Sequence, residues 1–236
     1  MIGIRAKVAV VRFPGSNCDL DTVSALRAFP HVEADLVWHE ESSIGGYEAI
    51  VLPGGFSFGD YLRAGAIAAK SPALERIRKS AERGTPVLGI CNGFQILIEA
   101  GLLPGSLLRN TSLKFVCRWV TIRVENDSTS FTRGIRKGQI IRIPIAHNEG
   151  RFFASESELD EISDRGQVVF RYCDEGGRSS PAANPTGTLD GIAGVCNKAS
   201  NVVGLMPHPE RATEPILSPF GSDDGSLIFK SMLESI

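Results

Sequence analysis

The chain has 236 residues, a formal net charge of −2 and 42 % hydrophobic residues. This size and apolar content suffice for one large α/β domain or two small ones, and the charge gives no electrostatic basis for binding nucleic acid or an anionic membrane. No apolar run in the sequence is long enough to span a bilayer. The five cysteines lack C-x-x-C or metal-ligand spacing, which predicts free thiols, a reducing cytoplasmic compartment and no metal site.

The first part of the chain alternates between predicted strands and helices. Apolar, β-branched runs predict buried strands at 7–13, 32–38 and 49–52. Helical patterning predicts helices over 18–29, capped by Asn17 or Asp19, and over 61–83, with a break near Pro72. Such alternation predicts a parallel sheet covered by helices on both faces.

Residues 86–101, P-V-L-G-I-C-N-G-F-Q-I-L-I-E-A-G, predict a strand, a sharp turn and a largely buried helix. The turn has the pattern G-x-nucleophile-x-G, with Cys91 in the place that serine often takes. Chain segments pass close to such a turn, so the positions two before and two after the nucleophile, Gly89 and Gly93, must lack side chains. A cysteine at a helix N-terminus is favoured as the thiolate, which is its reactive form. We therefore predict that Cys91 is a nucleophile.

From residue 115 onward the pattern changes to alternating strands. Strands are predicted at 115–124, 139–145, 167–172, 192–196 and 202–206, and a final helix at 225–233. A loop rich in Gly, Ser, Pro and Asn spans 174–189 and is a candidate docking element. We predict a three-layer α/β fold with an open, mostly parallel (mixed) sheet and helices on both faces. No repeat or linker divides the chain, so we predict a single domain over 5–236.

Residues 206–211, M-P-H-P-E-R, follow a predicted strand and are stiffened by two prolines. His208 and Glu210 project on a similar side, so Glu210 can accept a hydrogen bond from one ring nitrogen of His208. The other ring nitrogen is then free to take a proton from a thiol. Acyl transfer also needs backbone N–H groups aimed at the developing oxyanion, and Asn92 and Gly55 are the candidates.

Several motifs resemble those of the triad-type (class I) glutamine amidotransferases. They are F-P-G-S-N-C-D at 13–19, L-P-G-G-F-S-F-G-D-Y-L-R-A-G-A-I-A at 52–68, G-I-C-N-G-F-Q-I-L at 89–97, I-A-H-N-E-G-R-F at 145–152 and M-P-H-P-E-R at 206–211. Together they are similar to the glutaminase subunits of phosphoribosylformylglycinamidine synthase over nearly the whole chain. One departure is Asn148, where that family typically has Gly in H-G-E-G.

The resemblance implies a class I glutamine amidotransferase-like (flavodoxin-like) fold and a role for each matching residue. It assigns Cys91 as nucleophile, His208 as base, Glu210 as its orienter, Gly55 and Asn92 as oxyanion-hole amides, and Gln95, His147 and Glu149 as contacts of the substrate L-glutamine. Glutamine would be hydrolysed to glutamate and ammonia. The ammonia would pass to a large synthetase subunit that converts formylglycinamide ribonucleotide to formylglycinamidine ribonucleotide in purine biosynthesis. The family also has a small third subunit. ATP and Mg²⁺ would be used by the synthetase, and this chain would hold no cofactor.

Three alternatives remain open at this point: a glutaminase of another pathway, a Cys-triad hydrolase of the same fold, and an inert scaffold subunit. The intact Cys91, His208 and Glu210 argue against a scaffold, and the Pro-His-Pro-Glu spacing argues against the hydrolases. The other polar candidates are expected to be structural: Cys18 at a turn, Cys196 in a buried strand, Cys117 and Cys173 in the core, and His31 and His39 at the surface or at strand ends.

Overall fold

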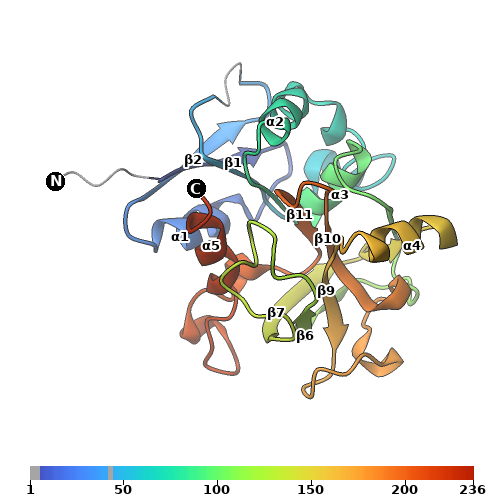
Figure 1. Cartoon of the computed structure of the whole chain (residues 1–236). Coiled ribbons are helices and arrows are strands. Elements are labelled where there is room, and N and C mark those ends of the chain that lie inside the picture. Colours follow the sequence, from blue (N-terminus) through green and yellow to red (C-terminus); the bar gives the residue numbers. More distant parts are fainter. Residues whose placement is uncertain (1–5, 42–44) are drawn as a thin grey trace.

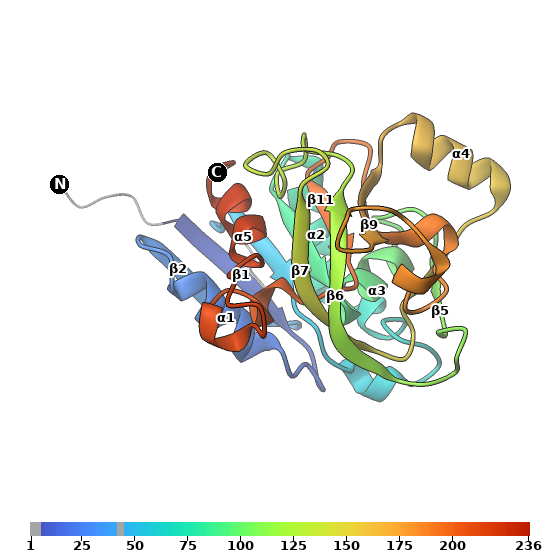
Figure 2. The ribbon, with the colours of Figure 1, turned by 90° about the horizontal axis from the view of Figure 1, so that it is seen from below.

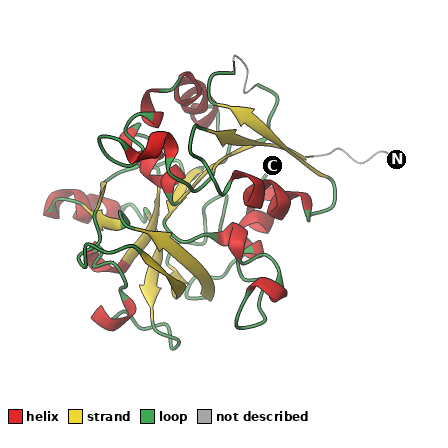
Figure 3. Cartoon of the chain, turned by 180° about the vertical axis from the view of Figure 1, so that it is seen from behind, coloured by secondary structure: helices red, strands yellow, loops and turns green. Residues whose placement is uncertain are grey.

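The computed structural model describes residues 6–41 and 45–236, so residue 5, the predicted start of the domain, lies outside the described residues. A nine-stranded sheet runs through the middle of the molecule, with helices around it (Figures 1 and 3). Its strand order is β2 (Val32–Trp38), β1 (Ala6–Arg12), β3 (Ala49–Leu52), β4 (Val87–Ile90), β11 (Val202–Leu205), β10 (Ile192–Cys196), β9 (Val168–Cys173), β6 (Val116–Val124) and β7 (Ile140–His147).

The half of the sheet from β2 to β11 is parallel. Its strands are short and apolar, and β3, β4 and β11 are buried along their whole length. Parallel strands need cover on both faces. α1 (Asp19–Arg27) and α5 (Ser226–Leu233) lie on one face, and α2 (Pro72–Glu82) and α3 (Asn92–Glu99) on the other (Figures 1 and 2). The predicted three-layer arrangement is therefore confirmed.

The other half of the sheet pairs in antiparallel fashion. β10 and β6 run opposite to the remaining strands, so the sheet is mixed but mostly unidirectional, as predicted. Val120, Ile122 and Val124 alternate with less buried neighbours, which is the period of a strand with one face in the core. A separate small sheet joins β5 (Ser106–Leu108) to β8 (Arg151–Phe153), and α4 (Glu156–Asp164) follows it.

The last strand of the chain, β11, lies in the middle of the sheet, between β4 and β10. It pairs in parallel with β4, and Leu205 stands opposite Ile90. Because the carboxyl ends of parallel strands meet at one edge, the segments that follow β1, β3, β4 and β11 come together there. These four segments carry Cys18, Gly55, Cys91 and His208, which are more than a hundred residues apart at the extremes.

Most predicted strands agree with the structure, and those at 32–38, 49–52 and 192–196 have the observed bounds. The helix predicted over 61–83 was wrong in its first part, because Leu62 and Gly65 have positive φ and α2 begins only at Pro72. Its cap is Ser71, whose hydroxyl accepts from the Ala73 N–H. The cap predicted for α1 was also wrong, since Cys18 holds that position and its side chain makes no capping hydrogen bond.

The strands β5 and β8 and the helix α4 were not predicted from the sequence. Short 3₁₀ turns complete the fold at Ser57–Asp60, Ala68–Lys70, Pro181–Ala183, Leu189–Gly191, Pro209–Arg211 and Pro215–Leu217. None of the helices within the described ranges is long and apolar enough to cross a bilayer.

One further prediction needs correction. Cys117 was expected in the core but is exposed, because β6 pairs with β9 only from Thr121 onward and its first half has β7 alone beside it. His39 directly follows β2, so it lies at a strand end as predicted, and its ring is buried against those of Phe13 and Phe58. Cys173, Cys196 and His31 lie as predicted, the cysteines buried and His31 exposed.

Candidate active site

Cys91 forms the turn between β4 and α3 and has a strained backbone, with φ 49° and ψ −104°. Such a conformation is unfavourable for a residue with a side chain and persists only where the surroundings impose it. Neither of the two flanking glycines can carry a side chain, as predicted. A Cβ on Gly93 would lie 2.0 Å from the Leu52 carbonyl oxygen, and a Cβ on Gly89 would lie 2.7 Å from the Gly93 carbonyl oxygen. The turn is therefore a nucleophile elbow, as the sequence pattern indicated.

The strand pairing fixes the position of this turn. The Cys91 N–H donates to the Leu205 carbonyl at 2.8 Å, which extends the β4–β11 ladder by one residue. The side chain is almost completely buried, and its sulfur lies 3.8 Å from the Ala146 carbonyl oxygen. The nucleophile candidate is thus attached directly to the strand that leads to His208.

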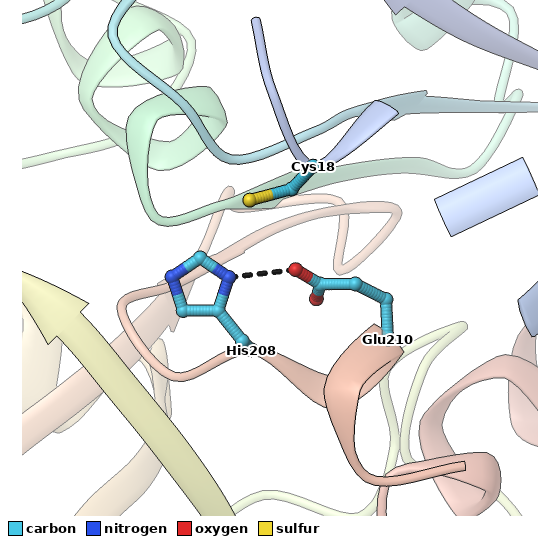
Figure 4. Close-up of side chains that lie close together, drawn as sticks. All are labelled: Cys18, His208 and Glu210. Carbon is cyan, nitrogen blue, oxygen red and sulfur yellow. Dashed lines mark hydrogen bonds and ion pairs between the residues drawn. The ribbon is translucent and has the colours of Figure 1, made fainter. Parts of the chain in front are cut away.

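His208 and Glu210 form a buried hydrogen-bonded pair just after β11. His208 Nδ1 lies 2.6 Å from Glu210 Oε1, as the dashed line in Figure 4 marks. The backbone N–H of His208 donates to the Pro144 carbonyl, which fixes the segment against β7. The second ring nitrogen, Nε2, has no hydrogen-bond partner among the described residues. The pair therefore leaves one nitrogen available for proton transfer, as predicted from the sequence.

The surroundings of His208 shift its pKa in opposite directions. Burial disfavours the imidazolium, but the negative charge of Glu210 and the nearby Cys91 sulfur outweigh burial and raise the pKa well above its ordinary value. The Cys91 sulfur is thus close enough to His208 to influence its protonation. This arrangement favours a protonated imidazole beside the nucleophile candidate.

Gly55 and Asn92, the predicted oxyanion-hole residues, belong to two segments that lie next to each other beside Cys91. Asn92 is the first residue of α3, so its N–H has no partner within the helix. Gly55 follows β3 with φ 145°, and a Cβ there would lie 2.8 Å from the Asn17 nitrogen, so only glycine fits. The Asn92 side chain joins the two segments, because its Oδ1 accepts from the Ser57 N–H at 3.0 Å.

A cavity of about 180 Å³ lies in front of Cys91. Among its lining residues are five that were predicted for the site: Gly55, Cys91, Gln95, His147 and Glu149. A larger cavity of about 570 Å³ lies between α2 and α4 and contains none of the predicted site residues. The small cavity is therefore the candidate substrate pocket.

The predicted substrate contacts line the pocket in different ways. Gln95 donates from Nε2 to the Glu149 carbonyl at 2.6 Å, and its Oε1 accepts from Asn92 at 2.9 Å, so this amide links helix and loop. The ring of His147 is buried against Gly150, where a Cβ would lie 2.0 Å from it. Burial, aided by the nearby His208, lowers the pKa of His147 to about 3, so this ring is neutral.

Two charged residues of the pocket, Asp60 and Arg109, were not predicted. Burial, and then the neighbouring Glu149, raise the pKa of Asp60 to about 6. Arg109 Nε lies 3.4 Å from Glu149 Oε1. The pocket therefore presents two carboxylates and one guanidinium. The motif that contains Asp60 was visible in the sequence, but its aspartate carried no distinguishing spacing.

Cys18 was predicted to be structural, and the structure places it next to two of the predicted catalytic residues. Its sulfur lies beside the His208–Glu210 pair, with the ligand atoms of all three side chains within 4.8 Å of one another (Figure 4). Arg211 donates from Nη2 to this sulfur at 3.1 Å. A second thiol therefore adjoins the imidazole, and these three residues are the group within the described residues that could hold a metal ion.

Comparison with known proteins gives consistent matches over almost the whole chain. Residues 5–232 match the family described as the CobB/CobQ-like glutamine amidotransferase domain. The chain is 54 % identical to the phosphoribosylformylglycinamidine synthase subunit PurQ of Methanosarcina mazei, over 98 % of both proteins. It is 52 % identical to the subunit of that name from Aquifex aeolicus, over 96 % of this chain and 99 % of the relative. A chain in the structure of PurLQS from Thermotoga maritima superposes with a TM-score of 0.84 and 45 % identity, over 98 % of each chain.

Proposed function

Because the chain belongs to the CobB/CobQ-like glutamine amidotransferase family, and within it to the PurQ subunits of phosphoribosylformylglycinamidine synthase, we propose that it is a glutaminase that supplies ammonia to a synthetase subunit. The observation that carries the proposal is the meeting of a strained Cys91 with the buried His208–Glu210 pair at one edge of the sheet. This is the nucleophile, base and orienter arrangement of acyl transfer.

The reaction follows from these groups. The Cys91 thiolate attacks the side-chain amide carbon of glutamine, and the backbone N–H groups of Gly55 and Asn92 stabilise the oxyanion. His208 gives its proton to the leaving nitrogen, so ammonia departs and a glutamyl thioester remains. His208 then takes a proton from water, whose oxygen attacks the thioester and releases glutamate. Glu210 holds the imidazole in position throughout.

The charges of the pocket suit the two ends of a free amino acid. Asp60 and Glu149 are placed to accept the α-ammonium group of glutamine, and Arg109 to pair with its α-carboxylate. Gln95 belongs to the same wall and fixes the Glu149 loop. We propose these roles because the neutral side-chain amide of glutamine would then extend toward Cys91. A residue inside a peptide would lack the free α-ammonium and α-carboxylate groups that these side chains would bind.

The partners proposed are the large ATP-dependent synthetase and a small third subunit, with formylglycinamide ribonucleotide as the acceptor of ammonia. ATP and Mg²⁺ would act on the synthetase, with no cofactor in this chain. Exposed apolar side chains beside the pocket support a docking surface there: Phe56, Tyr61, Leu62 and Phe115. We also propose a cytoplasmic location, since all five cysteines are free thiols.

The test is product formation by the reconstituted synthase with either glutamine or ammonium as nitrogen donor. Cys91→Ala is expected to abolish the glutamine-dependent reaction and to leave the ammonium-dependent reaction intact. Exposed Cys117 provides the control, since Cys117→Ser removes a thiol without touching the pocket. Equal loss of both reactions in Cys91→Ala, or full glutamine-dependent activity, would contradict the proposal.

A further inference from the structure

The His208–Glu210 pair has a second thiol beside it that the glutaminase reaction does not use. The Cys18 sulfur, a ring nitrogen of His208 and a carboxylate oxygen of Glu210 lie within 4.8 Å of one another, and all three residues are buried. Figure 4 shows the three side chains converging from two segments of the chain. Cysteine, histidine and carboxylate together are the ligand types of zinc sites.

The backbone holds Cys18 in this position. Its N–H donates to the Gly54 carbonyl at 3.2 Å, and its own carbonyl accepts from the Thr22 N–H and hydroxyl at 3.0 and 2.7 Å. A Cβ on Gly54 would lie 2.7 Å from His208 Cε1 and 3.2 Å from the Cys18 sulfur. The thiol and the imidazole therefore approach each other next to Gly54, which has no side chain, and the fold fixes this approach.

Glu210 supplies an independent sign of a missing partner. Its Oε1 bonds to His208, but its Oε2 is buried and has no hydrogen-bond partner among the described residues. A buried carboxylate oxygen without a partner is unfavourable unless a cation or a donor satisfies it. The free oxygen belongs to the same side chain that contributes to the three-residue group.

Another cavity lies beside this group, and Cys91 is not among its lining residues. It has a volume of about 410 Å³ and is lined by Glu210 and Arg211, together with the acidic residues Asp21 and Glu214. Carboxylates at such an opening attract cations. This cavity therefore draws cations toward the segment that carries Glu210, whose side chain is itself fully buried.

We propose that Cys18, His208 and Glu210 form a binding site for Zn²⁺ that switches the glutaminase off. On binding, the Cys18 S–H proton and the proton between His208 Nδ1 and Glu210 Oε1 both leave to solvent, and zinc bonds to the Cys18 sulfur, to His208 Nδ1 and to a Glu210 oxygen. The 2.6 Å separation of Nδ1 and Oε1 must widen to admit the metal. Three protein ligands leave one tetrahedral position for water. The inhibition rests on the proposed function, because it results from separating His208 from Glu210, which orients it. The metal binding itself does not depend on the proposed function.

The Arg211 guanidinium is the competitor of the metal. It donates to the Cys18 sulfur at 3.1 Å and is partly exposed, with Asp21 3.6 Å away on the solvent side. Zinc must displace the guanidinium from the Cys18 sulfur, so the positive charge of Arg211 opposes zinc binding. Removing the charge should therefore strengthen zinc binding, which is the opposite of what damage to the fold would do.

The first experiment measures zinc binding by the full chain, in competition with a chromophoric chelator, and follows the thiolate-to-cobalt absorption with Co²⁺. Wild type, Cys91→Ala and the control Cys117→Ser are expected to bind one ion per chain. Cys18→Ala and Cys18→Ser are expected to bind at least about 100-fold more weakly, as for loss of one zinc ligand. Arg211→Gln is expected to bind roughly tenfold more tightly, through loss of a nearby positive charge.

The second experiment measures glutaminase activity in the reconstituted synthase, with each variant compared with its own metal-free rate. Zinc is expected to inhibit Cys117→Ser like wild type, with recovery on adding chelator, and to spare Cys18→Ser. The proposal is overturned if no zinc binds, if the Cys18 variants bind like wild type, if Cys91→Ala loses the metal, or if Arg211→Gln binds more weakly. Absence of glutaminase activity in metal-free wild type would instead contradict the proposed function and leave the binding results standing.

Discussion

The elbow around Cys91 gives the sharpest structural prediction, through the substitution Gly93→Ala. The added Cβ would lie 2.0 Å from the Leu52 carbonyl oxygen and 2.8 Å from the Leu52 Cβ. Since real contacts of this kind are not closer than about 3 Å, the start of α3 must move away from β3 by about 1 Å. Overpacking of this kind costs about 1–3 kcal/mol of stability, and a shift of about 1 Å at a reacting group can cost about 100-fold in rate.

The assay compares two glycines at opposite ends of the same helix. Gly101 follows α3 with φ 67° and has nothing within 4 Å of an added Cβ, so Gly101→Ala strains only the backbone, by about 1–2 kcal/mol. Both variants are expected to unfold at lower urea concentration. Only Gly93→Ala should lose about 100-fold in kcat/KM for glutamine in the reconstituted synthase. If the two variants keep equal activity, the close packing of the elbow does not position the nucleophile.

Two further predictions concern the base and the pocket. Glu210→Gln keeps the size of the side chain but removes the charge from the 2.6 Å hydrogen bond to His208. The kcat with glutamine should fall about 10- to 100-fold, as for the loss of a charged hydrogen bond, and the ammonium-dependent rate should not change. An unchanged kcat with glutamine would contradict the orienting role of Glu210. Asp60, whose pKa burial and Glu149 raise to about 6, is ionised above pH 6 and protonated below it. The kcat/KM for glutamine should therefore fall as the pH drops through 6, and Asp60→Asn should lower kcat/KM at pH 8 and abolish this acidic limb. If kcat/KM of Asp60→Asn still falls as the pH drops through 6, another group causes the fall and the role of Asp60 is contradicted.

The parts of the site that sequence could predict are those set by local geometry. The G-x-C-x-G pattern encodes the elbow because both glycines meet backbone atoms of nearby segments. The Pro-His-Pro-Glu spacing likewise encodes the His208–Glu210 bond within one short stretch. For the same reason the short apolar strands of the parallel half were predicted closely, since they are buried on both faces.

The parts that escaped prediction depend on contacts between distant segments. Nothing local indicates that β11 lies between β4 and β10, yet this placement brings His208 to Cys91. Cys18 precedes an ordinary helix and donates to its neighbour Asn17, and nothing local indicates that the 206–211 segment brings Arg211 and His208 to its sulfur. Asp60 directly precedes the stretch that was predicted to be helical, which in fact runs irregularly because Leu62 and Gly65 take positive φ there.

The central claim is that Cys91, and not the neighbouring Cys18, is the sulfur that attacks glutamine. The most direct measurement is peptide mass spectrometry after treating the reconstituted synthase with a glutamine analogue that has a chloroketone in place of the side-chain amide. We predict a single adduct on Cys91, prevented by excess glutamine and absent in Cys91→Ala. An adduct on Cys18, or none on Cys91 while the synthase still uses glutamine, would contradict the account.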